Sequence, residues 1–235
     1  MMPVLENLLA KKGGTFVDIG VNIGQTLIKA ECVQPNLDYI GFEPNPICVF
    51  YSMELAKKNN FKNCNIVSVG VSNHDQVVEL KFFQANVVDT CATIVENLRP
   101  NMEITQRHLV PVFSLESLRG LIKTDQISVI KIDVEGAELE IIESLRTIIL
   151  ESRPTILIEI LPVYSLENKM RKERQDRFES IMSDLDYVVV RVLKNADGSL
   201  NRLQTIEQIG IHSNLRLCDY IFHPRESNHL FDSSR

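Results

Sequence analysis

The chain has 235 residues, of which 44% are hydrophobic and 24% charged, and this ordinary globular composition favours one α/β domain over two. Its formal net charge of −6 argues against a nucleic-acid partner, because binding a phosphate backbone requires clustered Lys and Arg side chains. The five cysteines have no zinc-binding spacing, and without a signal peptide or an apolar run long enough for a membrane span we expect a cytoplasmic protein with reduced thiols.

The first element that indicates function is a strand and turn at residues 15–24, with the sequence Thr-Phe-Val-Asp-Ile-Gly-Val-Asn-Ile-Gly. A short apolar run predicts the strand. Gly20 and Gly24 predict a tight turn at which a ligand can approach the backbone, because glycine has no Cβ. A helix is predicted at about 25–33, and its first N–H groups would be directed toward the ligand. We therefore expect a nucleotide-like molecule at this turn.

An acidic residue after the second predicted strand indicates which part of a nucleotide is bound. The Gly-x-Gly-x-x-Gly fingerprint of dinucleotide-binding folds is absent, since Asn22 and Gln25 stand at two of its glycine positions. Glu43 follows a strand predicted at 37–42, about 20 residues beyond the glycine turn. In a doubly wound sheet a carboxylate at this place accepts hydrogen bonds from ribose hydroxyls. The alternative is a solvated carboxylate in a turn.

The regular alternation of strands and helices stops between residues 74 and 114, after a helix at about 47–58 and a strand at 65–71. Strands predicted at 77–83 and 109–113 flank a polar stretch without periodicity. A long excursion inside a compact domain is usually functional. We expect a hairpin with a long tip beside the sheet and interpret it as a lid over the substrate. A loop without contact to the site is the alternative.

Strands and helices alternate again in the carboxyl-terminal half. Strands are predicted at 127–132, 155–160, 187–193 and 217–222, and helices at about 115–121, 138–150 and 168–185. Asp197-Gly198 predicts a turn between the last two strands, which no convincing helix connects. This pattern predicts an α/β sheet with helices on both faces. We expect a single domain over 1–224 and a polar, frayed tail over 225–235.

Four sequence blocks resemble the FkbM family of class I S-adenosylmethionine-dependent methyltransferases. The blocks are Val17–Gly24, Phe42–Pro46, Ile130–Glu138 and Arg153–Glu159, and the resemblance covers about residues 15–161. It implies a Rossmann-like class I fold, with a seven-stranded, mostly parallel sheet whose last strand is antiparallel. It also implies S-adenosylmethionine as the methyl donor and S-adenosylhomocysteine as the product. The acceptor in this family is usually a hydroxyl of a sugar, glycan, polyketide or similar small molecule.

The resemblance and the strand ends together indicate which residues bind the donor. A carboxylate at Asp18 suits the ammonium group of the methionine portion, and Glu43 suits the ribose. Val71 and Ser72 follow the third strand, where class I methyltransferases hold the adenine ring. The full set expected at the donor is Asp18, Gly20, Asn22, Gly24, Glu43, Val71, Ser72 and Asp133.

Methyl transfer to a hydroxyl also needs a group that accepts the hydroxyl proton. The candidates are the carboxylates of Asp133 and Glu135, and a histidine of the lid, His108. The alternative is a divalent ion, Mg²⁺ or Ca²⁺, bound by Asp133 and Glu159 and lowering the pKa of the hydroxyl. We favour a carboxylate. Lys131 lies in an apolar strand, and because a buried ammonium requires a partner we expect it to form an ion pair with a carboxylate at the sheet edge.

Three other functions compete with O-methylation. A protein that retains the fold could bind a nucleotide without catalysis and act as a scaffold, or the acceptor could be a nitrogen or a carboxylate. A nucleic-acid N-methylase is disfavoured, because Asp133-Val-Glu-Gly stands where those enzymes have Asp or Asn before Pro-Pro and an aromatic residue. The sequence leaves the acceptor, the position methylated and the oligomeric state open.

Overall fold

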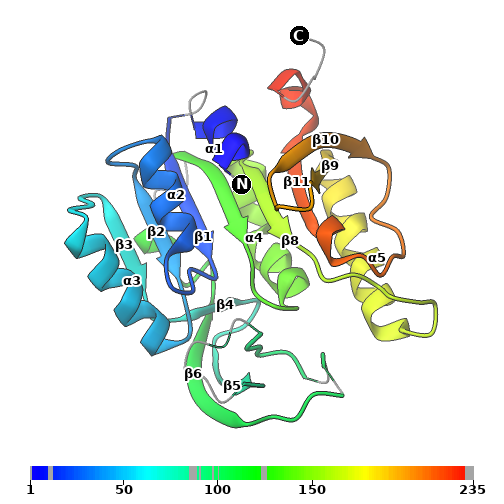
Figure 1. The fold of residues 1–235 in the computed structure, drawn as a ribbon, viewed down its shortest axis with the longest axis horizontal. Coiled ribbons are helices and arrows are strands. Elements are labelled where there is room, and N and C mark those ends of the chain that lie inside the picture. Colours follow the sequence, from blue (N-terminus) through cyan, green and yellow to red (C-terminus); the bar gives the residue numbers. More distant parts are fainter. Residues whose placement is uncertain are drawn as a thin grey trace.

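The centre of the fold is an eight-stranded sheet in the order β10-β9-β11-β8-β7-β1-β2-β3 (Figure 1). The computed structural model describes residues 2–9, 13–84, 89, 91–96, 98–99, 101–122 and 126–230. The strands of this sheet are β1 (Thr15–Ile19), β2 (Tyr39–Phe42), β3 (Cys64–Val67), β7 (Ile127–Ile132), β8 (Thr155–Glu159), β9 (Tyr187–Lys194), β10 (Leu200–Ile206) and β11 (Asp219–Pro224). Those from β3 to β8 pair in parallel, whereas β11 is antiparallel to its neighbours β8 and β9.

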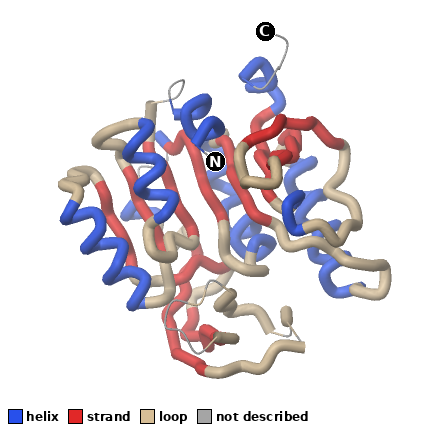
Figure 2. Tube along the Cα trace, viewed as in Figure 1, coloured by secondary structure: helices blue, strands red, loops and turns tan. Residues whose placement is uncertain are grey.

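Helices cover both faces of the sheet, as Figure 2 shows. The helices are α1 (Met2–Leu9), α2 (Gln25–Val33), α3 (Pro46–Lys58), α4 (Glu138–Ser152) and α5 (Lys169–Asp184), with shorter 3-10 helices η1 (Arg119–Leu121), η3 (Leu215–Leu217) and η4 (Arg225–Leu230). Apolar side chains of α1, α2 and α3 pack in one core cluster, and those of α4 and α5 pack in another on the opposite face. Each face of the sheet therefore has its own hydrophobic core.

Strand β1 shows how the sequence pattern produces this two-sided burial. All five of its residues are buried, as expected for a parallel strand covered on both faces. Phe16 packs in the α1–α2 cluster, while Val17 and Ile19 pack in the α4–α5 cluster, because successive side chains of a strand point to opposite faces. Strand β1 is an inner strand of the sheet, between β7 and β2, and its carboxyl end leads directly into the loop at Gly20.

A second sheet lies beside the first and contains the predicted hairpin. Its three strands are β4 (Gly70–Ser72), β5 (Gln76–Phe82) and β6 (Gln106–Ser114), in the order β4-β6-β5. Strands β5 and β6 pair antiparallel where the sequence predicts a hairpin, and in Figure 1 they lie below the main sheet. The third strand predicted at 65–71 is instead two strands, β3 and β4, which belong to different sheets.

The strand count of the main sheet is eight and not seven. The additional strand is β10, which forms an antiparallel hairpin with β9 across the turn at Asp197-Gly198. The turn was expected to lead into the last strand, which instead inserts between β8 and β9. The tail is also more ordered than expected, because η4 occupies 225–230 and Glu226 accepts a hydrogen bond of 2.8 Å from Arg153. Residues 231–235 lie outside the described part of the chain.

None of the helices in the described ranges is both long and apolar enough to cross a membrane. All five cysteines carry free thiols, and Cys48 and Cys218 are buried.

Candidate active site

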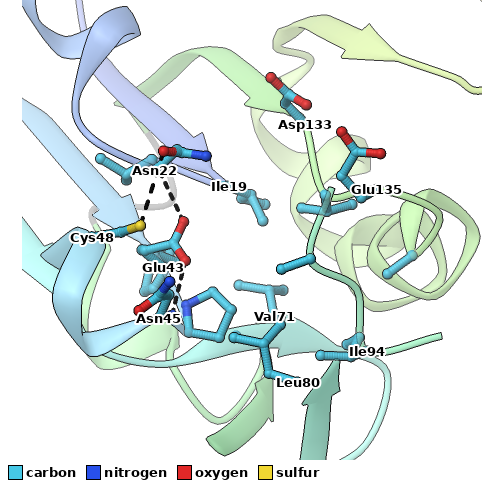
Figure 3. Close-up of a pocket in the computed structure, with 18 of the residues that line it drawn as sticks. Ile19, Asn22, Glu43, Asn45, Cys48, Val71, Leu80, Ile94, Asp133 and Glu135 are labelled. Atoms are coloured by element: carbon cyan, nitrogen blue, oxygen red, sulfur yellow. Dashed lines mark hydrogen bonds between the residues drawn. The ribbon is translucent and has the colours of Figure 1, made fainter. Parts of the chain in front are cut away.

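A cavity of about 260 Å³ lies at the carboxyl ends of β1, β2 and β7 (Figure 3). Three loops that follow these strands line it, at residues 20–22, 43–45 and 133–135, and Leu80 and Ile94 of the hairpin segment close it from the side. The chain order reverses at β1, since β2 lies on one side of this strand and β7 on the other. In open α/β sheets ligands bind in the crevice at such a reversal point.

Glu43 lines the cavity and is held in place by two backbone N–H groups. Its Oε2 accepts a hydrogen bond of 2.8 Å from the backbone N–H of Asn22, and its Oε1 accepts one of 2.8 Å from that of Asn45. Burial raises the pKa of Glu43 above its usual value, and the two N–H groups oppose this shift. A carboxylate has about four lone-pair sites, so each oxygen can accept one further hydrogen bond. The Glu43 carboxylate can therefore accept further donors from a molecule in the cavity.

Helix α3 fixes the position of the loop after β1. Ser52 lies in the middle of the helix, and its Oγ donates a hydrogen bond of 2.7 Å to the backbone oxygen of Asn22. Asn22 has a left-handed backbone with φ of 49°, and its Oδ1 accepts a hydrogen bond of 2.7 Å from Ile23 N–H. These contacts hold the Asn22 N–H toward Glu43. The loop is therefore preorganised by protein groups alone.

Lys131 forms the predicted ion pair beneath the cavity. Its Nζ lies 3.2 Å from Asp18 Oδ1 and 3.3 Å from Asp133 Oδ2, and it donates a hydrogen bond of 3.1 Å to the backbone oxygen of Gly20. The hydroxyl of Tyr39 donates a further bond of 2.6 Å to Asp18. Burial opposes the charge on Lys131, but the attraction of the two carboxylates raises its pKa above the usual value. The cluster therefore carries an ionised lysine at the floor of the site.

Three carboxylates lie on the side of the cavity away from Glu43. Figure 3 shows those of Asp133 and Glu135 across the cavity from Glu43, and the third belongs to Glu159 at the end of β8. Glu135 forms an ion pair with Arg99 of the hairpin segment. Burial raises the pKa of Glu135, and Arg99 opposes this shift. Burial and the nearby carboxylates raise the pKa of Glu159 to about 7.

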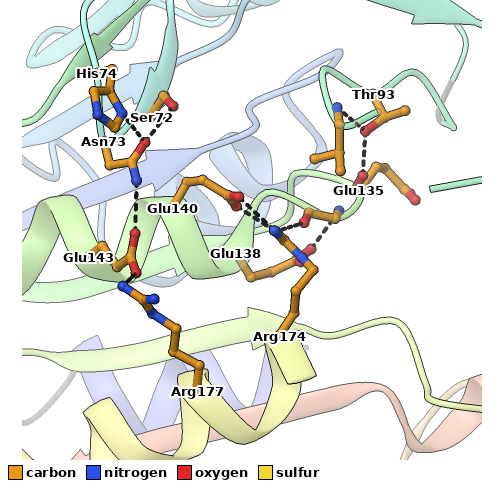
Figure 4. A network of polar contacts seen from close by, with 12 residues as sticks. Ser72, Asn73, His74, Thr93, Glu135, Glu138, Glu140, Glu143, Arg174 and Arg177 are labelled. Carbon is orange, nitrogen blue, oxygen red and sulfur yellow. Dashed lines mark hydrogen bonds and ion pairs between the residues drawn. The ribbon is translucent and has the colours of Figure 1, made fainter. Parts of the chain in front are cut away.

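A polar network holds the loop after β7 from two sides (Figure 4). From the hairpin segment, Thr93 Oγ1 donates a hydrogen bond of 2.7 Å to the backbone oxygen of Glu135. From α5, Arg174 donates bonds of 2.8 Å to the backbone oxygen of Gly136 and of 2.6 Å to Glu140. Glu138 begins α4, and its Oε1 accepts a bond of 2.9 Å from Gly136 N–H. The loop thus has a fixed conformation in which Glu135 faces the cavity.

The close approach of two loops explains why Gly20 is required. A Cβ at this position would lie 1.9 Å from the backbone oxygen of Asp133, and the φ of +90° is unfavourable for other residues. Gly24, with φ of +84°, would bring a Cβ to 2.7 Å from a methyl group of Leu55 in α3. A Cβ at either glycine would thus meet neighbouring protein atoms, and Gly20 also lines the cavity, where the sequence predicts room for a ligand.

Four residues expected in the site do not line the cavity. Asp18 is fully buried inside β1, one residue before the strand ends, and its partners are Lys131 and Tyr39. Gly24 faces α3, and Ser72 is buried in β4 with its hydroxyl 3.5 Å from Asn73. His108 lies on β6, and its ring packs 4.8 Å from that of Phe82. The expected residues that do line the cavity are Gly20, Asn22, Glu43, Val71, Asp133 and Glu135.

Several lining residues were not anticipated from the sequence. They are Gln25, Thr26, Asn45, Cys48, Leu80, Asp89, Ala92 and Ile94, among others. Asn45 carried a usable signal, because an Asn before Pro46 is a typical helix N-cap, and its Oδ1 accepts a hydrogen bond of 3.0 Å from Ile47 N–H. Lining residues of the hairpin segment, such as Ala92 and Ile94, could not be predicted, because their part of the sequence has no periodic pattern.

The cavity offers few side chains that could act together as metal ligands. Within the part of the chain that the structure describes, no group of three or more His, Cys, Asp or Glu side chains could hold a metal ion. Asp133 and Glu159 both line the cavity, but Asp133 is already paired with Lys131.

Comparison with known proteins assigns the family. Residues 18–189 match the model of the methyltransferase FkbM domain. The methyltransferase FkbM from Methylobacillus flagellatus KT has a similar structure, with a TM-score of 0.55 and 16% identity over 93% of this chain, which spans only 48% of that protein. A proposed rRNA-methylase from Clostridium thermocellum gives a TM-score of 0.52 at 10% identity, covering 94% of this chain and 90% of that one.

A proposed caffeoyl-CoA O-methyltransferase from Staphylococcus aureus also shares the fold, with a TM-score of 0.50 at 12% identity over 95% of this chain and 82% of that one. No curated protein matches the sequence. At such low identities the solved structures support the fold, a class I methyltransferase fold, and the domain match supports the family. The match extends from β1 into β9 and includes every loop that follows a cavity-lining strand. The chain therefore belongs to the FkbM methyltransferase family.

Proposed function

We propose that this chain binds S-adenosylmethionine in the cavity and transfers its methyl group to a hydroxyl oxygen of a small molecule or glycan. The sulfonium of S-adenosylmethionine supplies an activated methyl group. Glu43 binds the ribose hydroxyls, and Asn22 and Val71 lie beside the nucleoside. Asp133 lies on the far side of the cavity, where it is the carboxylate best placed for the donor's ammonium group.

The observation that carries this proposal is the arrangement of Glu43. Each of its oxygens accepts one backbone N–H and retains capacity for one more donor, at the carboxyl end of the strand that follows the glycine turn. A carboxylate that was merely structural would need no open cavity beside it, yet Glu43 lines this one. The site is therefore suited to a nucleoside with two free ribose hydroxyls.

The hairpin supplies the acceptor side in this proposal. Leu80, Ala92 and Ile94 give the cavity an apolar wall opposite the strand ends, and Arg99 reaches the site through Glu135. Alignment of the acceptor oxygen about 3 Å from the methyl carbon accounts for most of the catalysis expected in such a displacement. The hairpin acts as a lid that excludes water and orients the acceptor.

Calorimetric titration with S-adenosylhomocysteine tests the donor site. We expect micromolar binding by the wild-type chain and a loss of at least about tenfold in Glu43→Gln, which removes the charge that strengthens bonds from hydroxyls. Glu116→Gln is the matched control, because Glu116 is exposed and lies outside the cavity. An absence of binding by the wild-type chain would contradict the proposal and favour a scaffold that keeps only the fold.

Methyl transfer is tested separately with a donor labelled in the methyl group and a panel of monosaccharides, polyols, phenols, amines and carboxylates. We expect label only in the hydroxyl compounds, and label in amines or carboxylates alone would favour the other acceptor classes. Dialysis against a chelator is expected to leave transfer unchanged. Loss of transfer that Mg²⁺ restores would instead support a divalent ion between Asp133 and Glu159.

A further inference from the structure

The three carboxylates opposite Glu43 differ in how they are paired. Asp133 lies 3.3 Å from the ammonium of Lys131, and Glu135 forms an ion pair with Arg99. The Glu159 carboxylate accepts no hydrogen bond and forms no ion pair with any residue in the described ranges. A carboxylate held by a cation has less tendency to take up a proton, because protonation would give up the attraction. Glu159 is therefore the group of the three that is free to accept one.

Glu159 lies beside the reacting side of the cavity. It ends β8, whose Ile158 pairs with Ile132 of β7, so Glu159 stands next to Asp133 at the same sheet edge. The Glu159 side chain lines the main cavity and also a smaller one of about 40 Å³, and Asp133 lines both as well. Glu159 thus contributes to both cavities, at the strand ends on the side of Asp133 and away from Glu43.

The groups that face Glu159 make it hold a proton more tightly than an ordinary carboxyl. Burial is the largest influence on its pKa, followed by the charges of Asp133, Asp219 and Glu135, and together they raise it to about 7. Lys194 is the cation that opposes them, and it is already paired with Asp219. A general base is most effective when its pKa is near the working pH, and this environment supplies that property.

We propose that Glu159 is the general base of the reaction, taking the proton of the acceptor hydroxyl as the oxygen attacks the methyl carbon. This assignment rests on the proposed function. A bond forms between the acceptor oxygen and the methyl carbon while the carbon–sulfur bond breaks, and its electron pair remains on sulfur. The hydroxyl proton moves to a carboxylate oxygen of Glu159. The products are the methyl ether, S-adenosylhomocysteine and a protonated Glu159, which then releases the proton to water.

The assignment predicts that Glu159 senses the charge of the sulfonium, and this can be measured without an acceptor. S-adenosylmethionine carries a sulfonium charge that S-adenosylhomocysteine lacks, while the two share every other titrating group. A positive charge beside a carboxylate lowers its pKa by about one unit or more. We therefore expect the ratio of the two dissociation constants to shift about tenfold in favour of S-adenosylmethionine between pH 5.5 and 8.5.

The variants identify the carboxylate responsible. In Glu159→Gln the ratio should become independent of pH while S-adenosylhomocysteine still binds, and in Glu159→Asp, which keeps the charge, part of the dependence should remain. Glu116→Gln is the control and should behave as wild type. Thermal unfolding of each variant confirms that it is folded. A ratio that does not change with pH in the wild-type chain, or that changes equally in Glu159→Gln, would overturn the assignment.

The second readout is turnover with the hydroxyl compound that the labelled-donor panel identifies. Loss of a general base lowers kcat by about 10²- to 10⁴-fold, and we expect this in Glu159→Gln with unchanged affinity for S-adenosylhomocysteine. If Glu159→Gln keeps kcat within threefold of wild type, Glu159 is not the general base. The proposed function would stand in that case, because the variant would still bind the donor. Failure of the wild-type chain to bind S-adenosylhomocysteine would instead contradict the proposed function.

Discussion

The Nζ of Lys131 lies 3.2 Å from Asp18 Oδ1, and both side chains are at least nine-tenths buried. Their registers explain the pairing, since Asp18 of β1 stands opposite Lys131 of β7 on the same face of the sheet. The pair lies directly beneath the loop that carries Gly20, whose backbone oxygen accepts a bond from the same ammonium. A charged group inside the sheet thus supports the floor of the cavity.

Replacing Lys131 by Met should destabilise the protein by about 3 to 5 kcal/mol, because the Asp18 carboxylate would be left buried without a cation. Urea denaturation of the two proteins measures this difference. Lys172→Met is the control, since Lys172 pairs with Asp176 on the exposed side of α5 and such a pair contributes about 0 to 1 kcal/mol. Equal losses of unfolding free energy in the two variants would show that the buried ion pair stabilises the protein no more than the exposed one.

Gly20→Ala should destabilise the protein by more than about 4 kcal/mol, because the new methyl group would lie 1.9 Å from the backbone oxygen of Asp133. Gly198→Ala separates this clash from backbone strain. Gly198 also has a positive φ, of +81°, but no atom within 4 Å of the added Cβ, so we expect a cost of only about 1 to 2 kcal/mol. Similar unfolding midpoints in urea for the two variants would rule out the clash.

Glu138 should make the stability of the protein fall as the pH rises. Burial raises its pKa from 4.5 to about 7, so the folded chain retains a proton that the unfolded chain releases. The stabilisation is fully present below pH 4.5 and is lost as the pH rises through 7. Glu138→Gln keeps an acceptor for Gly136 N–H and removes this dependence. We therefore expect the melting temperature of Glu138→Gln, relative to that of the wild-type chain, to be higher at pH 8 than at pH 5. The same difference in melting temperature at both pH values would contradict this prediction.

Thr93→Val should loosen the contact between the hairpin segment and the loop after β7. The substitution keeps the shape of the side chain but leaves the backbone oxygen of Glu135 and the N–H of Val95 without the Thr93 hydroxyl. We expect a loss of about 1 to 3 kcal/mol and faster amide exchange at 91–96. Thr105→Val is the control, because Thr105 lies at an exposed part of the hairpin. Unchanged exchange at 91–96 would mean that other contacts hold the segment.

The elements with strong local signals were predictable from the sequence. The helix predicted at 25–33 coincides with α2, since a glycine precedes it and an apolar face follows. Strand β10 was missed for a physical reason. It is an edge strand, and side chains such as Arg202 and Gln204 are exposed, so its sequence has little of the apolar alternation that identifies a strand. The break between β3 and β4 was missed because alternation continues across it while the chain changes sheets.

Residues that directly follow a strand end could be assigned to the cavity from the sequence. Residues inside a strand could not, because the direction of the side chain decides whether they reach the cavity. Glu43 and Asp133 come directly after β2 and β7, and both line the cavity. Asp18 belongs to the same motif but lies one residue before the end of β1, where its side chain points into the sheet toward Lys131. Whether a carboxylate of the cavity has a cationic partner also depends on long-range contacts, such as the ion pair of Arg99 with Glu135. Such contacts cannot be predicted from the local sequence.

The separation of β4 from β3 has a consequence for how the hairpin of this protein can vary. Strand β4 provides Val71 to the cavity and pairs with β6, so the ladder β4-β6-β5 anchors both ends of the hairpin beside the cavity. The segment between β5 and β6 can therefore be lengthened, shortened or exchanged while the anchoring strands stay in register. If the hairpin orients the acceptor as proposed, grafting this segment from another member of the family should change which acceptor is methylated and leave the affinity for S-adenosylmethionine unchanged.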